Sequence, residues 1–289
     1  MRINVIAATG RLGGKVVEAL LEMGLAPENI IASVRTPSKA DGLAAQGIEV
    51  RRADYDDYES LETAFAGTDV LLLIPSTAAV EPRVAQFGNA VRAAKAAGVG
   101  RIVFAGVYTA TPESLFQVAP FILYAESKIR QSGLEWTLVR ANMYMESMLG
   151  WLGRFVEEGR LPYPLREGRI AFVAYGDLGR SIAAVLKGNG MHGKIFELSG
   201  PEAPSMAELA QVLSEETKEL IRFDFPSEQD YLAFSKMDKA SPALLDILLS
   251  MYRSAEAGEW SRVTDHVEQL TGRKPTSIRE MAREMWKGR

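Results

Sequence analysis

The sequence predicts an α/β protein with a doubly wound parallel sheet and a smaller, mainly helical C-terminal lobe. Two observations lead to this prediction. Through the first 140 residues, short β-branched runs alternate four times with stretches of helical periodicity, as in right-handed crossovers between parallel strands. After residue 140 this alternation stops, and from 227 to 289 the apolar spacing is almost wholly helical.

Each element of the first half has a local signal. The run 69–75 is apolar throughout, which is typical of a strand covered on both faces. The stretch 57–67 opens on an aspartate and closes on Gly67, the usual residues at helix ends. In chain order, the expected strands are 3–8, 30–34, 48–54, 69–75 and 100–107, and the expected helices are 12–24, 37–47, 57–67 and 84–98.

The second half has helical patterns at 175–188 and 205–219, with the run 193–200 between them ending in a glycine turn. The stretch 244–252 is the most apolar part of the helical tail. We expect this lobe to lie against the carboxyl edge of the sheet, where open α/β sheets bind ligands. No linker rich in proline or glycine separates the halves, so we expect them to share a core.

The composition excludes several function classes. Of 289 residues, 47% are hydrophobic and 24% charged, as in soluble globular proteins, and the net charge of −4 does not suggest nucleic-acid binding. The absence of cysteine excludes thiol chemistry, and the separated His192 and His266 predict no metal site. No signal peptide precedes the first strand, and no apolar run approaches the ~20 residues of a membrane span. We expect a cytoplasmic protein.

The stretch NVIAATGRLGG at 4–14 predicts a phosphate-binding loop between a strand and a helix. The N–H groups of the first helical turn, together with the helix dipole, would face a pyrophosphate. We expect Gly10 to provide a positive φ in the turn and Gly13 to let the helix pack closely on the strand. Ala7 replaces the leading glycine of the usual spacing, and an ordinary helix entry without ligand is the alternative. The loop residues predicted to bind the cofactor are Thr9, Gly10, Arg11, Leu12 and Gly13.

The end of the second strand favours NADPH over NADH. It reads SVRTPSK and has no acidic residue for a ribose 2′-hydroxyl, whereas Arg35 can bind a 2′-phosphate with Lys39 as a second charge. Solvated basic residues on a turn are the alternative. Asp54 borders the adenine in this prediction, unless it caps a helix. The further predicted cofactor contacts, at the ends of the third and fourth strands, are Asp54, Tyr55, Ile74 and Ser76.

Several stretches resemble short-chain dehydrogenases/reductases of the atypical, NmrA-like branch, close to the NAD(P)H:quinone, triphenylmethane and azo-dye reductase-like proteins. They include ATGRLGG, VRTPSK, WTLVRANMYMESML, EGRIAFVAYGDLGRSIAAVL and TGRKPTSIREMARE, so the resemblance covers nearly the whole chain. It implies a Rossmann domain with a small lobe over the nicotinamide. We assign 1–150 to the NAD(P)-binding domain, with 170–200 packing on it, and 151–289 mainly to the substrate-binding lobe.

The stretch YAESK places Tyr124 and Lys128 four residues apart, on one helical face. This matches the Tyr-x-x-x-Lys pair of the wider superfamily. The resemblance implies that Lys128 binds the nicotinamide ribose and that Tyr124 supplies a proton. A surface helix with two solvated side chains is the alternative. The superfamily's third catalytic residue is a Ser or Thr, for which Thr109 is the first candidate and Thr111 the second.

Asn142, Tyr144 and Glu146 follow the strand WTLVR, where family members line the substrate cavity, although a core-facing stripe is equally compatible. The prediction is an NADPH-dependent reductase that transfers hydride to a small conjugated acceptor such as a quinone or a dye-like compound. The alternatives are a non-catalytic NAD(P)-binding redox sensor and a sugar-nucleotide epimerase or dehydratase. We expect a small-molecule partner, no nucleic acid and no membrane, with a homodimer as the assembly considered.

Overall fold

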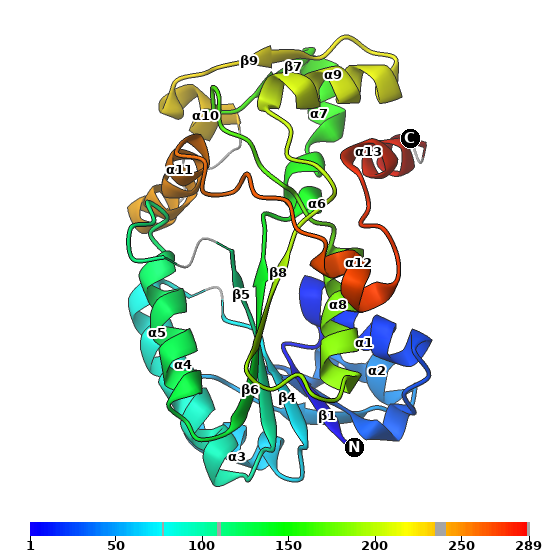
Figure 1. The fold of residues 1–289 in the computed structure, drawn as a ribbon, viewed down its shortest axis with the longest axis vertical. Coiled ribbons are helices and arrows are strands. Elements are labelled where there is room, and N and C mark those ends of the chain that lie inside the picture. The colour runs from blue at the N-terminus through cyan, green and yellow to red at the C-terminus, as the bar shows by residue number, and fades with distance from the viewer. Residues whose placement is uncertain (77, 109–110, 235–240, 288–289) are drawn as a thin grey trace.

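A seven-stranded sheet forms the centre of the molecule (Figure 1). The computed structural model describes residues 1–76, 78–108, 111–234 and 241–287. Every neighbouring pair in the sheet is parallel, in the order β3-β2-β1-β4-β5-β6-β8, which confirms the doubly wound prediction. The strands of this sheet are β1 (Ile3–Ile6), β2 (Ile30–Val34), β3 (Glu49–Arg52), β4 (Val70–Leu73), β5 (Arg101–Val107), β6 (Glu135–Ala141) and β8 (Lys194–Leu198).

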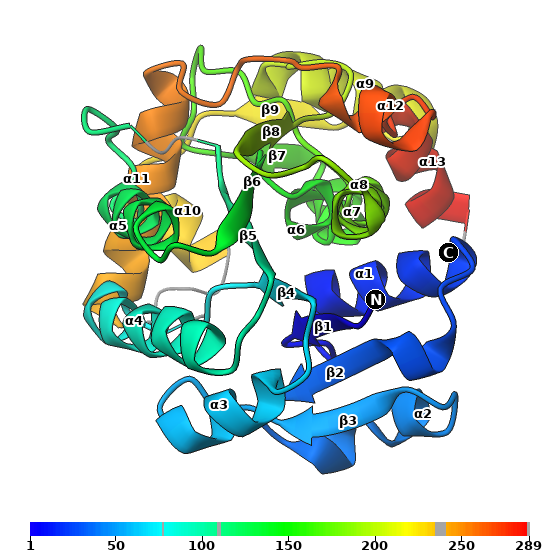
Figure 2. The same ribbon diagram turned by 60° about the horizontal axis from the view of Figure 1, so that its bottom comes forward.

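Helices cover both faces of the sheet (Figure 2). One face packs against α3 (Tyr58–Phe65), α4 (Val80–Ala96) and α5 (Ala119–Arg130), and the other against α1 (Arg11–Glu22) and α8 (Tyr175–Lys187). The helix ends of α3 follow the sequence signals, since the Asp57 carboxylate accepts from the Ser60 N–H at 3.1 Å and Gly67 has a φ of 67°. The short α2 (Asp41–Ala44) lies beside β3.

Close packing joins the helices to the sheet and to one another. Phe87 of α4 packs edge-on against Phe104 of β5 and Phe121 of α5, with ring centroids 5.0 and 5.8 Å away. Such buried aromatic pairs contribute about 1 kcal/mol each beyond their area. On the other face, a Cβ on Gly179 of α8 would lie 2.6 Å from the carbonyl oxygen of Lys15 in α1, so only glycine allows this approach.

The chain leaves the sheet after β6, returns through α8 and β8, and leaves it again. These two excursions build the lobe at the carboxyl edge of the sheet (Figure 1). The pairing of β7 with β9 was not predicted, because strands of three residues are too short for a periodicity signal. The remaining elements are α6 (Met145–Leu149), α7 (Leu152–Glu158), β7 (Arg160–Pro162), α9 (Met206–Thr217), β9 (Arg222–Asp224), α10 (Glu228–Phe234), α11 (Pro242–Glu256), α12 (His266–Thr271) and α13 (Ile278–Lys287).

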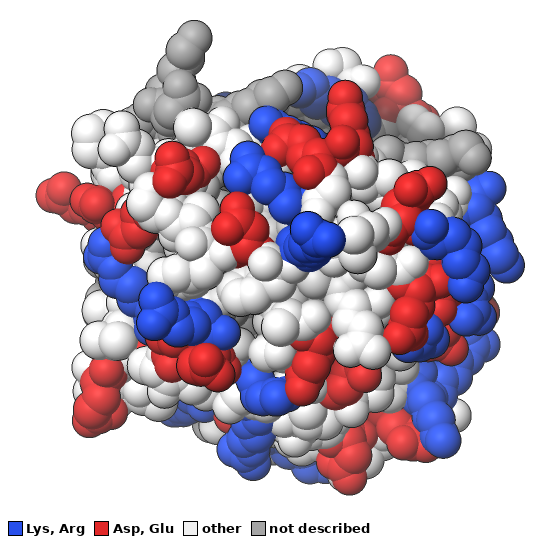
Figure 3. Space-filling model, turned by 90° about the horizontal axis from the view of Figure 1, so that it is seen from above, with Lys and Arg blue, Asp and Glu red and all other residues white. Residues whose placement is uncertain are grey.

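The surface over the lobe has mixed charge. Lys and Arg side chains alternate with Asp and Glu across the face seen from above (Figure 3), so this view shows no continuous basic field. None of the helices in the described part of the chain combines the length and the apolar character that a membrane crossing requires.

Candidate cofactor and substrate site

The loop between β1 and α1 has the geometry of an anion cradle. Gly10 is the N-cap of α1, no side chain caps this end, and the first turn contains no acidic residue. The N–H groups of Arg11, Leu12 and Gly13 occupy the first turn, where a helix offers them no carbonyl partner. A Cβ on Gly13 would lie 2.3 Å from the carbonyl oxygen of Ala7, so the helix entry packs directly on the strand end. These features fit a pyrophosphate at the exposed loop.

The turn itself differs from the prediction. Gly10 has a φ of −80° and a ψ of 169°, an extended conformation open to any residue, so the expected positive φ at Gly10 is wrong. Ala7 takes the left-handed conformation instead, with a φ of 55°. The Gly10 N–H donates to the Ala7 carbonyl oxygen at 2.8 Å and closes the turn. The positive φ therefore falls at Ala7, three residues before Gly10, where it was expected. The reversal therefore falls at the position where the usual spacing has glycine.

Three basic residues are free to meet anions beside this loop. Arg35 directly follows β2, and Lys39 ends the short 3₁₀ turn after it. Both are exposed, as is Arg11, and none of the three pairs with an acidic residue in the described part of the chain. The Ala8 N–H reaches the carbonyl oxygen of Ser33 at 3.5 Å, which places the loop alongside the end of β2.

Asp54 and Tyr55 lie just past β3 at the same edge, because the Ala53 N–H donates to the Val34 carbonyl oxygen. Asp54 accepts the Asp56 N–H at 3.1 Å and does not cap α3, which Asp57 does. The Tyr55 hydroxyl donates to the Ile74 carbonyl oxygen at 2.6 Å, and burial raises its pKa. Tyr55 therefore links the ends of β3 and β4.

A cavity of about 450 Å³ lies at the carboxyl ends of β4 and β5. Ile74 and Ser76 line it, as the predicted contacts after the fourth strand, together with Val107 from β5. Arg83 is the charged side chain among its described lining residues, and its guanidinium donates to the Ala78 carbonyl oxygen. We name this space the edge cavity. Its place beside the phosphate loop is where a bound dinucleotide would project its nicotinamide.

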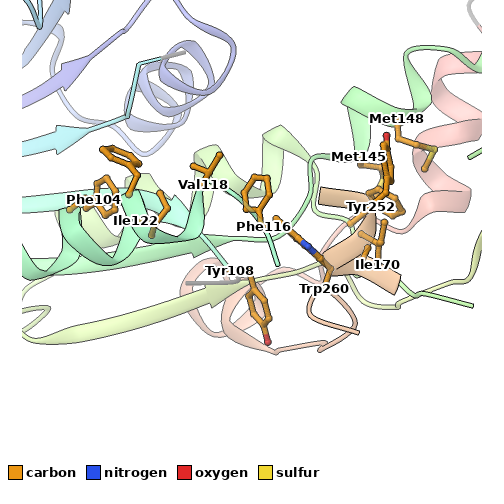
Figure 4. Packing of buried hydrophobic residues seen from close by; sticks show 14 of the residues in the cluster. Phe104, Tyr108, Phe116, Val118, Ile122, Met145, Met148, Ile170, Tyr252 and Trp260 are labelled. Atoms are coloured by element: carbon orange, nitrogen blue, oxygen red, sulfur yellow. The ribbon is translucent and has the colours of Figure 1, made fainter. Parts of the chain in front are cut away.

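A second cavity of about 340 Å³ adjoins the edge cavity on the side of the lobe, and Val107 and Tyr144 line both. We name it the lobe cavity. In Figure 4, Ile122 and Val118 line the edge cavity. Beyond them lie Phe116 and Trp260, and then Tyr252 and Met148, all of which line the lobe cavity. None of its described lining residues is charged. They are Val107, Phe116, Asn142, Met143, Tyr144, Ser147, Met148, Trp151, Tyr163, Ile170, Phe172, Met206, Tyr231, Leu248, Met251, Tyr252 and Trp260.

Helix α11 connects the two cavities. Leu244 and Ile247 from its first turns line the edge cavity, whereas Leu248 and Met251 line the lobe cavity. Ser241 caps the start of this helix, and its hydroxyl accepts from the Leu244 N–H. One helix of the lobe thus covers the space where hydride would leave the cofactor and the space beyond it.

The three residues predicted after WTLVR have different positions. Asn142 and Tyr144 line the lobe cavity. The Asn142 amide is already engaged, because it donates to the Trp260 carbonyl oxygen at 3.1 Å and accepts the Met143 N–H at 2.7 Å. Glu146 lines neither cavity. Its carboxylate accepts the Tyr175 N–H at 2.9 Å and caps α8, and burial raises its pKa. The geometry thus gives Glu146 a helix-capping contact and does not support its predicted substrate role.

The structure does not bring Tyr124 and Lys128 to either cavity. Both line a separate groove between α4 and α5, where a Cβ on Gly88 would lie 3.5 Å from the Tyr124 hydroxyl. The Lys128 ammonium is 5.5 Å from the centre of the Tyr124 ring. Tyr124 and Lys128 share one face of α5, as their four-residue spacing predicts, but that face packs along α4. Direct proton transfer from Tyr124 to an acceptor in the cavities is thus geometrically unsupported.

Thr109, the first candidate for the third catalytic residue, lies outside the described residues. Thr111 is described and exposed, and its carbonyl oxygen accepts the Ser114 N–H at 3.2 Å. Neither cavity includes Thr111. The catalytic part of the superfamily pattern therefore has no assembled counterpart among the described residues.

Known proteins resemble this chain over nearly its whole length. The sequence matches the NmrA-like family over residues 1–282. The chain belongs to the NmrA-like family. Quinone oxidoreductase 2 of Escherichia coli (strain K12) is 34% identical over 278 residues, which are 96% of either chain. The crystal structure of the NADPH-dependent quinone oxidoreductase QOR2 of Escherichia coli, complexed with NADPH, has a TM-score of 0.92 at 32% identity and covers 98% of this chain and 99% of its own.

Other similar structures are described with different functions. Triphenylmethane reductase of Citrobacter sp., complexed with NADP(H), has a TM-score of 0.92 at 30% identity, over 99% of this chain and all of its own. A Staphylococcus aureus structure described as a nucleoside-diphosphate-sugar epimerase has a TM-score of 0.90 at 29% identity, over 98% of this chain and all of its own. The fold alone therefore leaves the substrate open, and the cavities must decide it.

Sequence reasoning missed most of the lobe cavity. Tyr163, Tyr231, Tyr252 and Trp260 come from parts of the chain that showed no recognisable motif. The signal available was the aromatic and methionine content of 143–172 and 231–260, which is also what an ordinary core contains. Only the convergence of β7, α10 and α11 turns these residues into a cavity wall.

Proposed function

We propose that this protein is an NADPH-dependent reductase that acts on a flat, conjugated, uncharged or weakly charged acceptor of the quinone or dye type. The observation that carries the proposal is that two cavities adjoin at Val107 and Tyr144. One lies at the carboxyl ends of β4 and β5, and the other is lined by apolar and aromatic side chains. The relatives named for quinone and triphenylmethane reduction support the same chemistry.

In this proposal the chain's own residues bind and orient. Backbone N–H groups at Arg11–Gly13 hold the pyrophosphate, Arg35 and Lys39 hold the 2′-phosphate, and the edge cavity holds the nicotinamide. NADPH, when bound, would supply the hydride, and the protein positions the acceptor. Because Tyr124 lies elsewhere, we assign the proton for the reduced product to solvent entering at the cavity mouth.

The cavity chemistry favours a reductase over the predicted alternatives. A nucleoside-diphosphate sugar needs cations for its phosphates, and no Lys, Arg or His is among the described residues that line the lobe cavity. A redox sensor needs no acceptor pocket, whereas this chain keeps about 340 Å³ open beyond the nicotinamide position. Methionines in the wall suit varied flat ligands, since their side chains adapt to ligand shape.

The proposal is tested by measuring NADPH oxidation with a panel of quinones and cationic dyes. We expect saturable turnover with at least one quinone. Tight NADP binding without turnover across the panel would contradict the reductase and favour the sensor. The cytoplasmic location, the homodimer and the division of function near residue 150 stay predictions.

The cofactor assignment has its own test, the variant Arg35→Ala. Loss of a bidentate contact to the 2′-phosphate should weaken NADPH binding by about 10- to 100-fold and leave NADH binding within about twofold. Calorimetric titration with both coenzymes measures this. An unchanged preference would show that Arg35 does not select the cofactor. Arg222→Ala, on the distant β9, is the matched control and should bind both coenzymes as the parent protein does.

A further inference from the structure

Three tyrosines from three separate elements meet in the wall of the lobe cavity. Tyr163 follows β7, Tyr231 lies in α10 and Tyr252 lies in α11, and their ring centroids are 5.1 to 5.6 Å apart. Each side chain is almost completely buried. Phenylalanine would fill the same space without burying a polar group, so the hydroxyls need a role. We name these residues the tyrosine cluster.

The hydrogen bonds of the tyrosine cluster are incomplete. The hydroxyl oxygens of Tyr231 and Tyr252 are 2.6 Å apart, so one hydroxyl donates to the other. The accepting hydroxyl keeps a proton for which the described residues offer no acceptor. The Tyr163 hydroxyl makes no hydrogen bond within the described part of the chain, and Tyr163 lines the lobe cavity.

These hydroxyls are donors over the whole physiological pH range. Burial raises the pKa of Tyr231 to about 12 and raises the pKa values of Tyr163 and Tyr252 well above the usual value for tyrosine. A neutral phenol keeps its proton and offers it to a lone pair. The wall therefore presents uncharged hydrogen-bond donors to whatever occupies the cavity.

Of the other polar side chains of the lobe cavity, Tyr144 lies where the two cavities adjoin, Asn142 and Trp260 are hydrogen-bonded, and Ser147 is exposed. The Asn142 amide binds the Trp260 and Met143 backbone, and the Trp260 indole N–H donates to the Ser254 hydroxyl at 2.8 Å. In Figure 4, Tyr252 lies beyond Phe116 and Trp260 from the edge cavity, so the tyrosine cluster is remote from the position of the nicotinamide.

We propose that the tyrosine cluster is a subsite that binds an oxygen of the acceptor at the end remote from the atom that receives hydride. The inference rests on the proposed reductase function and narrows its substrate class. The preferred acceptor is an elongated, flat molecule with uncharged oxygens at opposite ends, as in a 1,4-quinone. One end lies near Val107 and Tyr144, and the other accepts a hydrogen bond from the cluster.

The test compares 1,4-naphthoquinone with naphthalene, which has the same ring system and no oxygen, by calorimetric binding to the NADP-loaded protein. The variant replaces all three hydroxyls, Tyr163→Phe/Tyr231→Phe/Tyr252→Phe, because any hydroxyl of the cluster that remains could still donate to the ligand. We expect its Kd for naphthoquinone to rise about tenfold and its Kd for naphthalene to stay within about twofold. Tyr58→Phe on α3 is the control and should change neither value. Unaltered NADP binding and thermal unfolding show that the variants fold.

Two results would overturn the subsite. Equal changes for both ligands would mean that the tyrosines only pack, and no change for naphthoquinone would mean that their hydroxyls do not contact it. Failure of the reductase proposal gives a different result. No quinone would then support NADPH oxidation, even if naphthoquinone binding still responds to the variant.

Discussion

Ala7 and Gly13 show how single residues build the cofactor loop. Ala7 holds a φ of 55°, which costs a residue with a Cβ about 1 kcal/mol relative to glycine. The chain tolerates this because the Gly10 N–H and the packing of α1 fix the turn. The Ala7 carbonyl oxygen then occupies the space that a side chain at position 13 would need. The two positions are therefore coupled, and glycine is required at the second.

The variant Gly13→Ala tests this coupling. Its Cβ would lie 2.3 Å from the Ala7 carbonyl oxygen, so α1 must move and its N–H groups must leave the pyrophosphate position. We expect NADPH affinity to fall at least about tenfold and the melting temperature to drop. The matched control is Gly14→Ala, whose Cβ meets its nearest neighbour at 3.7 Å and adds helix propensity. Equal NADPH affinity for the two variants would refute the close-packing argument.

At the scale of elements, α5 shows why a correct motif can have the wrong location. Its buried face includes Phe121, Ile122, Ala125 and Ile129. Tyr124 lies off that face, toward α4, while Ile122 and Val118 reach the edge cavity. The helical phase, set by the apolar residues, thus decides that the hydroxyl of Tyr124 does not enter the cavity.

The variant Tyr124→Phe distinguishes a tyrosine that only packs in the groove between α4 and α5 from one that donates a proton to the acceptor. Because its hydroxyl lies in the groove between α4 and α5, we expect kcat for quinone reduction to stay within about twofold of the parent value. A general acid in contact with the acceptor would instead cost about 10²- to 10⁴-fold. The rate of NADPH oxidation under saturating quinone measures the difference, and a loss of the larger size would restore Tyr124 to the mechanism.

Ion pairs attach α13 to α9. Arg279 and Arg283 of α13 bind the Glu216 carboxylate at 2.7 and 2.9 Å. Hydrogen bonds from Arg283 and Arg279 lower the pKa of Glu216 from 4.5 to about 2. A carboxylate with a depressed folded-state pKa stabilises the protein fully above its unfolded-state value, and this stabilisation is lost as the pH falls from about 4.5 toward 2.

The variant Glu216→Gln should therefore lower the melting temperature at neutral pH, and its difference from the parent protein should shrink as the pH falls below about 4.5. Calorimetric melting temperatures measured between pH 7 and pH 2 give the profile. Glu22→Gln on α1 removes a carboxylate that forms no ion pair with a described residue and should follow the parent profile. A Glu216→Gln difference that is constant with pH would show that the ion pairs contribute nothing to stability.

At the scale of the whole molecule, the lobe converts an open sheet edge into an enclosed site. The chain departs after β6 and again after β8, so segments from 143 to 260 cover the carboxyl ends of strands formed before residue 108. Structures that match this chain over 98–99% of its length, sheet and lobe together, with TM-scores of 0.90 to 0.92, are described with different activities. The side chains that line the cavities, rather than the fold, therefore decide the acceptor.

The sequence by itself determined the alternation of strands and helices in the first half and the positions of the glycine-containing loop after β1 and of the cations after β2. Each of these depends on residues within a few positions of one another, whose hydrogen bonding and apolar spacing are local. Only the tertiary structure decided that the turn reverses at Ala7, that α5 presents Tyr124 to α4, and that three distant tyrosines share a cavity. These depend on which element packs against which, because side chains separated by tens of residues meet only when the core closes.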